Sequence, residues 1–251
     1  MPDPLRAVSL DLTDEGAELP DLTADLLLVC LTADDRDEGG YRRTYVDGMR
    51  RGLAAATRSG APQRAVLVSS TGVYGDVEGW IDEATEPRPE RGTSRVLLEA
   101  ERAFGEVLPH GTVARLSGLY GRAAPRVVEQ VRRGDRPHPG RWTNRIHRDD
   151  AAAAVVHLLT RDEAPGPLYV VSDDEPCTAG QLQDFVAEQL GIGGDATEEG
   201  VTPFGKRLDN ALLRATGLEL TYPSYRDGYP PLLRESTPTS RPTSRTASRT
   251  G

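Results

Sequence analysis

The chain of 251 residues lacks the features that mark several common protein classes. Its two cysteines, Cys30 and Cys177, are isolated in the sequence, so they form neither a metal cluster by themselves nor a disulfide framework. No run approaches the ~20 apolar residues of a membrane helix. Met1–Asp14 lacks the basic and then apolar pattern of a signal peptide. We therefore expect a cytoplasmic protein with no metal and no membrane partner.

Positive charge is also scarce. The net charge is -9 at pH 7, and the acidic residues are spread along the chain. A protein that binds the phosphate backbone of a nucleic acid needs the opposite balance, so we expect no nucleic-acid partner. Lys206 is the only lysine, and the other long basic side chains are all arginine. We interpret this bias as a property of the source's composition.

Segments typical of strands alternate with segments typical of amphipathic helices. This alternation predicts an α/β fold with a parallel sheet. The expected strands are Ala7–Leu12, Asp25–Thr32, Ala65–Ser70, Thr112–Ser117 and Leu168–Val171. The expected helices are Tyr41–Arg58, Ser94–Val107, Asp149–Thr160 and Thr178–Leu190.

Several of the expected strands end in polar or small residues. Three hydroxyls, Ser69–Thr71, follow the apolar run Ala65–Val68 directly. Other such ends are Asp11 with Thr13, Thr32 with Ala33, and Ser117 with Gly118. Ligands of open α/β sheets bind outside the carboxyl ends of the strands, so the repetition predicts a ligand site there. For any single strand, the polar end is explained as well by the chain leaving the core.

Several motifs occur together in a characteristic order. "LVSSTGVYGD" is followed by "DEATEPRP" (Asp82–Pro89) and the helix "SRVLLEAERAF". The others are "YRRTYVDGMRRGL", "VARLSGLYG", "NRIHRDDAAAAVVHLL" and "YPSYRDGY". Over roughly residues 7–233, the chain resembles the extended short-chain dehydrogenase/reductases, the NAD-dependent epimerase/dehydratase family, in an atypical form.

The resemblance implies a Rossmann-like parallel sheet with a small C-terminal substrate lobe. Residues 1–160 would form an N-terminally incomplete Rossmann core, and residues 161–233 the lobe together with a late sheet strand. Residues 234–251 contain no apolar side chain larger than that of Ala247 and are expected to be a disordered tail.

The resemblance also implies a cofactor, NAD or NADP, and a small-molecule substrate, often a nucleotide sugar. Ser70 matches the family's active-site hydroxyl, which would bond a substrate oxygen as it becomes or ceases to be a carbonyl. Asp11 and Leu12 would flank the adenine, and Arg95 would hold a ribose or phosphate. The remaining expected cofactor-binding residues are Leu31, Thr32, Ala33, Ser69, Leu116 and Ser117.

One departure from the family pattern is the missing Gly-x-Gly-x-x-Gly turn, because the chain opens at what resembles the family's third strand. The literal match Gly191–Ala196 follows an expected helix and leads into acids, so we interpret it as a helix end and loop. The missing part predicts weak binding of free NAD(P), an unpaired sheet edge and a bare apolar face. Poor solubility would follow, or cover from a partner subunit, as in a homo-oligomer.

The other departure is the missing Tyr-x-x-x-Lys pair. Arg91 stands at the position of the tyrosine and Arg95 at that of the lysine. Arg91 thus occupies a catalytic position, but a guanidinium stays protonated and cannot exchange the tyrosine's proton. Both arginines are explained equally well as solvated residues at a helix start. Tyr74 is a candidate replacement acid, or a packing residue.

Three functions are weighed. A serine hydrolase would need a base such as His147 near Ser69 or Ser70, but the sequence has no Gly-x-Ser-x-Gly elbow. Two readings stay open. One is an NAD(P)-dependent oxidoreductase or epimerase with altered catalytic residues. The other is a non-catalytic Rossmann-like sensor or scaffold, or a truncated inactive homologue.

Overall fold

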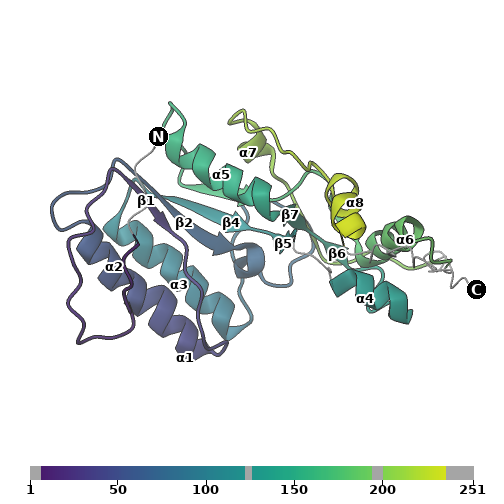
Figure 1. The fold of residues 1–251 in the computed structure, drawn as a ribbon, viewed down its shortest axis with the longest axis horizontal. Coiled ribbons are helices and arrows are strands. Elements are labelled where there is room, and N and C mark those ends of the chain that lie inside the picture. The colour runs from purple at the N-terminus through teal and green to yellow at the C-terminus, as the bar shows by residue number, and fades with distance from the viewer. Residues whose placement is uncertain (1–6, 122–125, 194–199, 236–251) are drawn as a thin grey trace, which may run out of the picture.

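The computed structural model describes residues 7–121, 126–193 and 200–235 (Figure 1). The expected tail beyond residue 235 and the end of the Gly191–Ala196 match therefore lie outside the described residues.

The centre of the molecule is a four-stranded parallel sheet in the order β1-β2-β4-β8. Its strands are β1 (Leu26–Val29), β2 (Arg64–Ser70), β4 (Thr112–Leu116) and β8 (Leu168–Val171). Their sequences are nearly continuous apolar runs, as expected of strands with both faces covered. The prediction of an α/β fold with a parallel sheet is confirmed.

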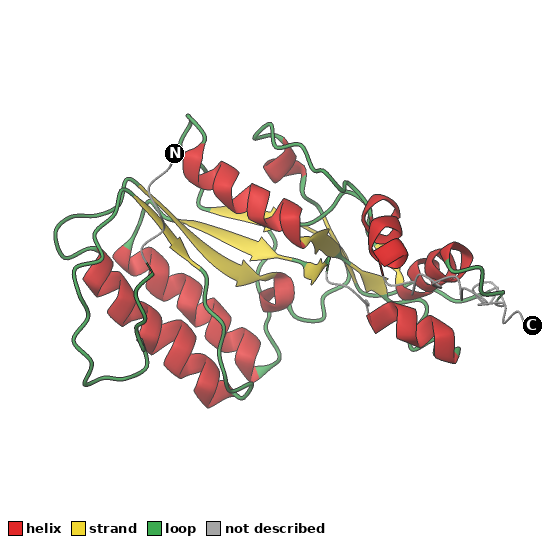
Figure 2. Cartoon of the chain, viewed as in Figure 1, coloured by secondary structure: helices red, strands yellow, loops and turns green. Residues whose placement is uncertain are grey.

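Helices cover both faces of this sheet (Figure 2). One face carries α1 (Glu38–Tyr41), the π-helical segment η1 (Arg42–Gly48), α2 (Met49–Ala56) and α3 (Gly92–Val107). Their core includes Met49, Leu53 and Phe104. The opposite face carries α5 (Arg148–Thr160), whose Leu158 packs against Val66 and Ala114 of the sheet.

The first helical region differs from its expected bounds. It begins at Glu38, because the side chain of Asp37 caps it by accepting a hydrogen bond from the Gly40 amide. It ends at Ala56, and its middle is π-helical. The other expected helices are confirmed with small shifts of their ends, and β8 has the bounds that the sequence predicted.

The expected strand Ala7–Leu12 is wrong, because residues 7–11 have no regular structure. Local hydrogen bonds form here in place of strand-to-strand hydrogen bonds. The Asp11 carboxylate accepts from the amide of Thr13 at 2.8 Å and from the hydroxyl of Thr13 at 2.7 Å. Such side-chain contacts compete with strand pairing. Leu12 instead packs beside Gly48, where a Cβ would lie 3.3 Å from the Cβ of Leu12.

The second part of the chain builds a smaller lobe, which lies beyond the carboxyl ends of β2 and β4 (Figures 1 and 2). Its helices α4 (Arg126–Arg133), α6 (Ala179–Gln189) and α8 (Tyr225–Glu235) share a core that includes Val128, Val186 and Tyr225. Strands β6 (Trp142–Thr143) and β9 (Cys177–Thr178) pair antiparallel within it. The short helix α7 (Ala211–Arg214) places Leu213 in the α5 core.

Two short strand pairs connect this lobe to the sheet. Strand β10 (Lys206–Leu208) pairs in parallel with β3 (Gly79–Ile81), which follows β2 in the chain. Strand β7 (Arg145–His147) pairs in parallel with β5 (Gly118–Tyr120), which follows β4. Segments of the lobe are thereby fixed next to the loops that leave the sheet.

Candidate functional site

The turn after β2 is a single 3-10 turn, η2 (Thr71–Tyr74). Ser70 is extended, and its Oγ caps the turn by accepting from the amide of Gly72 at 3.1 Å. Gly75 ends the turn at φ 70°, where a Cβ would lie 2.0 Å from the carbonyl oxygen of Arg88. Only glycine fits there, so the path of the backbone around Ser70 is tightly set.

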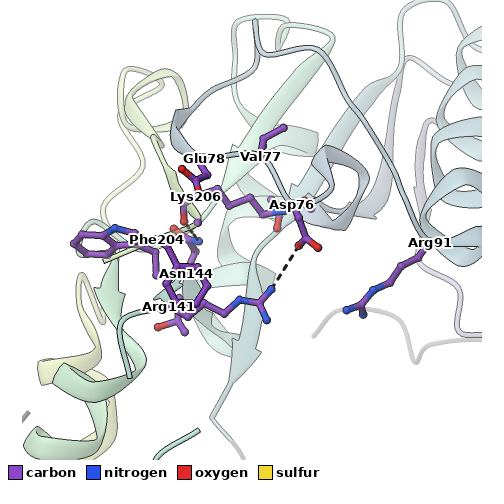
Figure 3. Close-up of a pocket in the computed structure, with 12 residues that line it drawn as sticks. Asp76, Val77, Glu78, Arg91, Arg141, Asn144, Phe204 and Lys206 are labelled. Atoms are coloured by element: carbon purple, nitrogen blue, oxygen red, sulfur yellow. Dashed lines mark hydrogen bonds and ion pairs between the residues drawn. The ribbon is translucent and has the colours of Figure 1, made fainter. Parts of the chain in front are cut away.

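A cavity of about 590 Å³ lies between this turn and the C-terminal lobe (Figure 3). A smaller one of about 140 Å³ adjoins it and shares Asp76, Arg91, Arg141 and Lys206 in its wall. The turn side of the two cavities comprises Thr71, Gly72, Gly75, Asp76, Val77, Glu78, Glu90, Arg91 and Ser94. The lobe side comprises Arg141, Trp142, Thr143, Asn144, Phe204, Gly205 and Lys206.

Three cations line both cavities, which we call the cationic cavities: Arg91, Arg141 and Lys206. Among the acids, Asp76 lines both, Glu78 the larger and Glu90 the smaller. A guanidinium nitrogen of Arg141 lies 3.6 Å from a carboxylate oxygen of Asp76, with both groups largely exposed. The ammonium of Lys206 is half-buried, and this burial lowers its pKa below the usual value. Arginine forks and an ammonium together are suited to bind phosphate or carboxylate oxygens.

Aromatic rings lie on the lobe side of the larger cavity. Trp142 and Phe204 line it, and the Phe204 side chain is well exposed. The Arg207 guanidinium stacks between two indole rings, 4.7 Å from the centroid of Trp80 and 5.1 Å from that of Trp142. The wall therefore offers flat apolar surface beside cationic groups.

The predicted catalytic residues Ser70 and Arg91 are close to the same space. Arg91 lines both cavities at the N-cap of α3. Ser70 lines neither, but the next two residues do. A Cβ at Gly72 would lie 3.3 Å from Oγ of Ser70 and 3.5 Å from Oγ of Ser94. Ser94 in the first turn of α3 is thus a second hydroxyl beside the turn, which sequence reasoning missed.

The third predicted catalytic residue, Tyr74, is fully buried and lines neither cavity. Its hydroxyl donates to the carbonyl oxygen of Asp82 at 2.8 Å, and the Arg115 guanidinium lies 4.7 Å from its ring centroid. Burial raises the pKa of Tyr74 above its usual value. These contacts correspond to the packing role that the sequence had left open.

Ser69 takes part in a buried network. Its hydroxyl donates to Glu101 at 2.6 Å, and Arg115 donates to the same carboxylate at 2.7 Å. Leu116, at the end of β4, accepts from the hydroxyl of Thr71 at 3.3 Å. Ser117 is buried, and its hydroxyl has no hydrogen-bond partner within the described ranges. These residues support the turn from behind.

Arg95, the remaining predicted cationic residue, lies outside both cavities. It donates to the carbonyl oxygen of Glu90 at 2.6 Å and lies 3.6 Å from a carboxylate oxygen of Glu38. Arg91 and Arg95 are therefore not brought together.

A third cavity of about 260 Å³ lies between β1, α2 and the first described residues. Leu12 and Leu31 line it together with other side chains that are all uncharged. Their neighbours Asp11, Thr32 and Ala33 do not line it, and Asp11 bonds only locally to Thr13. The structure thus joins part of the predicted cofactor set in one apolar site, separate from the cationic cavities.

A nicotinamide dinucleotide fits these residues only in part. The apolar cavity suits a flat ring, and the Ser70 turn offers hydroxyls. The pyrophosphate, however, needs backbone amides or cations. The apolar cavity has no charged lining residue, and the nearby start of α1 carries Asp35, Asp37 and Glu38. No complete phosphate cradle is therefore formed by the part of the chain that the structure describes.

The geometry also bears on the other chemistries considered. His147 is buried between the rings of Tyr120 and Tyr222, with centroid distances of 5.2 and 4.1 Å, and it lines neither cationic cavity. A hydrolase base is thus not brought to Ser70. Among the described residues, no cluster of three His, Cys, Asp or Glu side chains could hold a metal. Within the same ranges, no helix is long and apolar enough to cross a membrane.

Sequence reasoning missed the lobe side of the site, above all Arg141, Trp142, Phe204 and Lys206. These residues lie more than sixty positions after Ser70 in the chain, and the β3–β10 pairing brings Lys206 to the turn. One signal could have identified Lys206: it is the only lysine in the sequence.

Comparison with known proteins gives several similarities. No protein-family model matches the chain. Protein YeeZ of Escherichia coli K12 is 30% identical over 218 residues, which cover 80% of this chain and 73% of YeeZ. A candidate NAD-dependent epimerase/dehydratase from Methylobacillus flagellatus is 34% identical. Its structure superposes with a TM-score of 0.77 over 94% of this chain and 85% of that one.

More distant structures share the fold alone. The UDP-glucuronic acid 4-epimerase from Bacillus cereus, solved in complex with NAD, is 16% identical with a TM-score of 0.69. The match covers 85% of this chain and 76% of the epimerase.

Proposed function

Because the chain belongs to the NAD-dependent epimerase/dehydratase family, we propose that it acts as an NAD(P)-dependent epimerase or dehydratase-like oxidoreductase with altered catalytic residues. Its substrate is a small molecule with anionic oxygens, and a nucleotide sugar is the class that we propose. The observation that carries this function is the cavity beside the Ser70 turn, lined by Arg91, Arg141 and Lys206.

The two sides of the cavity suit different parts of such a substrate. A diphosphate matches the cationic groups, and a flat base matches the exposed ring of Phe204 on the lobe side. The sugar would then lie at the turn, where the hydroxyls of Ser70 and Ser94 lie beside Gly72. We assign Ser70 to a hydrogen bond with the reacting oxygen of the sugar, and Arg91 to binding of the phosphate. Tyr74 holds the turn through Asp82.

The cofactor would be NAD or NADP, and when bound it supplies hydride transfer. We propose that Leu12 and Leu31 hold its adenine in the apolar cavity, with Asp11, Thr32 and Ala33 next to it. Ser69, Leu116 and Ser117 would lie behind the nicotinamide side, and Arg95 would bind a ribose or phosphate. Since the described residues form no complete pyrophosphate cradle, we derive no reaction step from this cofactor.

A second candidate function is supported by that same missing cradle. A non-catalytic sensor or scaffold would keep the substrate cavity and bind the nucleotide sugar without the cofactor. We further propose that the protein is located in the cytoplasm and that it forms a homo-oligomer.

Calorimetric titration of the purified protein separates the candidates. The ligands are UDP-glucose, dTDP-glucose and GDP-mannose, followed by NAD and NADPH alone. Saturable binding of a nucleotide sugar and of a dinucleotide supports the enzyme. Binding of the sugar without either dinucleotide supports the sensor.

Binding of none of these ligands contradicts both candidates. The variant Arg141→Gln should weaken the sugar titration by roughly tenfold or more, as expected for loss of a hydrogen bond to a charged group. The control is Arg50→Gln, because Arg50 pairs with Glu106 on the surface of the α2–α3 layer and lines neither cationic cavity. Its affinity should equal that of the wild type.

A further inference from the structure

Lys206 is the only lysine of a chain that has 30 lysine and arginine residues in all. It lies in the wall shared by the two cationic cavities. The excess of arginine by itself reflects composition, but it does not explain why the one ammonium stands at this position.

The ammonium of Lys206 holds both ends of the Ser70 turn. Its Nζ donates to the carbonyl oxygen of Thr71 at 3.0 Å and to that of Gly75 at 2.7 Å. Thr71 is the first residue of η2, and Gly75 follows its last residue. One side chain of the lobe therefore fixes the start and the end of the turn that directly follows Ser70.

The backbone behind this lysine is itself firmly placed. Lys206 begins β10, which pairs with β3 from Gly79 to Ile81. On its other side, the Asn144 amide donates to the carbonyl oxygen of Lys206 at 2.9 Å and accepts from the amide of Leu208 at 2.8 Å. The lobe thus presents the ammonium to the turn from a strand that is bonded on both sides.

A lysine ammonium carries three hydrogens and no acceptor. The two turn carbonyls take two of them. In Figure 3, the Lys206 side chain reaches along the cavity wall toward Asp76, and Arg141 lies across from it. The third hydrogen is the one that an oxygen of a ligand in this cavity can accept.

We propose that Lys206 is a positioning and ligand-binding residue: its ammonium clamps the Ser70 turn at Thr71 and Gly75 and gives its third hydrogen to an anionic oxygen of the ligand. Occupation of the cavity is thereby coupled to the position of Ser70. The class of ligand rests on the proposed function, whereas the clamp on the turn does not.

Arginine would not replace lysine here. The ammonium is compact, and its three hydrogens point in tetrahedral directions toward two carbonyls and one ligand oxygen. A guanidinium is planar, and its fork suits one bidentate partner rather than three separate ones. This difference gives a physical reason for a single lysine in a chain that otherwise uses arginine.

The charges around Lys206 agree with a ligand that is negative. Burial lowers the pKa of Lys206, the nearby Asp76 raises it, and Arg141 and Arg91 lower it. A phosphate in the cavity would offset the two arginines and stabilise the ammonium.

The single lysine makes a direct chemical test feasible. The wild-type protein is treated with sulfo-N-hydroxysuccinimidyl acetate, and acetylation of Lys206 is followed by peptide mass spectrometry. The N-terminal amine serves as the internal reference. Acetylation without ligand should be roughly tenfold or more slower than in the urea-unfolded chain. Only the neutral amine reacts, and in the folded protein the half-buried nitrogen must first leave the carbonyl oxygens of Thr71 and Gly75, which outweighs its lowered pKa. Equal rates in both states would overturn the clamp.

Ligand coupling is tested in the same assay with UDP-glucose and, separately, inorganic pyrophosphate. Either ligand at saturation should slow acetylation of Lys206 further while the N-terminal amine reacts as before. If UDP-glucose binds calorimetrically and leaves the Lys206 rate unchanged, the inference fails and the proposed function stands. If neither probe binds, the ligand half fails together with the proposed function.

The variants Lys206→Met and Lys206→Arg test the positioning role. In Lys206→Met, amide hydrogen exchange should increase in the peptide covering residues 69–77, and UDP-glucose affinity should fall roughly tenfold or more. In Lys206→Arg, neither the slow amide exchange of this peptide nor the wild-type affinity for UDP-glucose should return in full. The control Arg50→Met should change neither readout. Unchanged amide exchange and unchanged affinity in a folded Lys206→Met protein would overturn the inference. If this variant does not fold, the acetylation test on the wild-type protein decides the inference.

Discussion

At the scale of single residues, the buried charges beneath the Ser70 turn contribute more to stability than the charges on the surface. Arg115 and Glu101 are almost fully buried, with 6% and 7% of their side chains exposed, and a guanidinium nitrogen lies 2.7 Å from a carboxylate oxygen. Ser69 bonds the same carboxylate, and Tyr74 lies under the guanidinium. Removing one member would leave an uncompensated charge inside the protein.

Glu101→Ala should therefore lower the free energy of unfolding by about 3–5 kcal/mol. Urea denaturation followed by circular dichroism measures this. The matched control is Glu99→Ala on the same helix, because Glu99 pairs with Arg42 on the exposed surface. Its effect should be close to zero. A small loss for Glu101→Ala would show that water reaches Arg115.

Asp173 makes stability depend on pH. Its side chain is almost fully buried, and within the described residues neither carboxylate oxygen accepts a hydrogen bond of normal geometry. Burial raises its pKa from 3.8 to about 8, against the opposing charge of Arg145 and the nearby amide of Glu175. The folded protein thus holds a proton that the unfolded chain releases near pH 4, so stability is lost as pH rises from there through 8.

Wild-type protein should unfold at lower urea concentration at pH 8 than at pH 5, at about 1.4 kcal/mol for each pKa unit traversed. Asp173→Asn should remove most of this slope, because an amide does not titrate. Denaturation curves of both proteins at several pH values measure the difference. Parallel slopes in the two proteins would contradict a raised pKa for Asp173.

At the scale of elements, the side chain of Asn144 acts as a strand partner for β10. It provides one donor and one acceptor to the Lys206–Leu208 backbone, as a neighbouring strand would. Asn144→Ala should lower the free energy of unfolding by about 1–3 kcal/mol, because the partly buried Lys206 carbonyl and Leu208 amide lose their partners. It should also speed acetylation of Lys206, since the strand that carries the lysine is loosened.

The control for that variant is Gln63→Ala, because Gln63 is an exposed amide at the start of β2 with a single 3.3 Å side-chain bond to Asp25. Its stability and its Lys206 acetylation rate should equal those of the wild type. If Asn144→Ala leaves the Lys206 rate unchanged, β3 alone holds β10 in place.

Hydrophobic patterning predicted well those helices and strands whose apolar residues are buried in the core. Leu168–Val171 is a continuous apolar run, and it is β8. Ala7–Leu12 is interrupted by Ser9 and Asp11 and forms no strand, because Asp11 accepts hydrogen bonds from Thr13 and the described sheet ends at β1. Local polar contacts and missing pairing partners are not visible in a pattern of apolar residues.

The candidate site was predicted on one side only. Ser70 and Arg91 belong to the sheet and its helix, so strand ends and family motifs led to them. Arg141 and Phe204 come from irregular segments of the lobe, and Lys206 begins the three-residue strand β10, which is too short for periodicity to mark. Their position beside the turn depends on strand pairs of three residues or fewer, such as β3 with β10. Such short pairings are set by the tertiary fold.

At the scale of the whole molecule, the sheet has an exposed apolar edge. In the described sheet β1 pairs only with β2, and Leu26 and Leu28 are 46% and 45% exposed. The sequence had predicted an unpaired edge, and this is confirmed for the described residues. The predicted bare face is wrong as stated, because helices cover both faces of the sheet and only Leu26 and Leu28 of β1 stay exposed. Exposed apolar edge strands favour association between molecules.

Replacing Leu26 with threonine tests whether this edge limits solubility. Threonine suits a strand and leaves the net charge unchanged, so only the exposed apolar surface is reduced. Static light scattering over a concentration series should show weaker association for Leu26→Thr than for the wild type.

The matched variant Val29→Thr, on the same strand, places a hydroxyl in the core formed with Leu53 and Phe104. It should lose about 1–3 kcal/mol of stability, since that hydroxyl is buried. If Leu26→Thr associates as strongly as the wild type, another surface or a stable homo-oligomer interface governs the association.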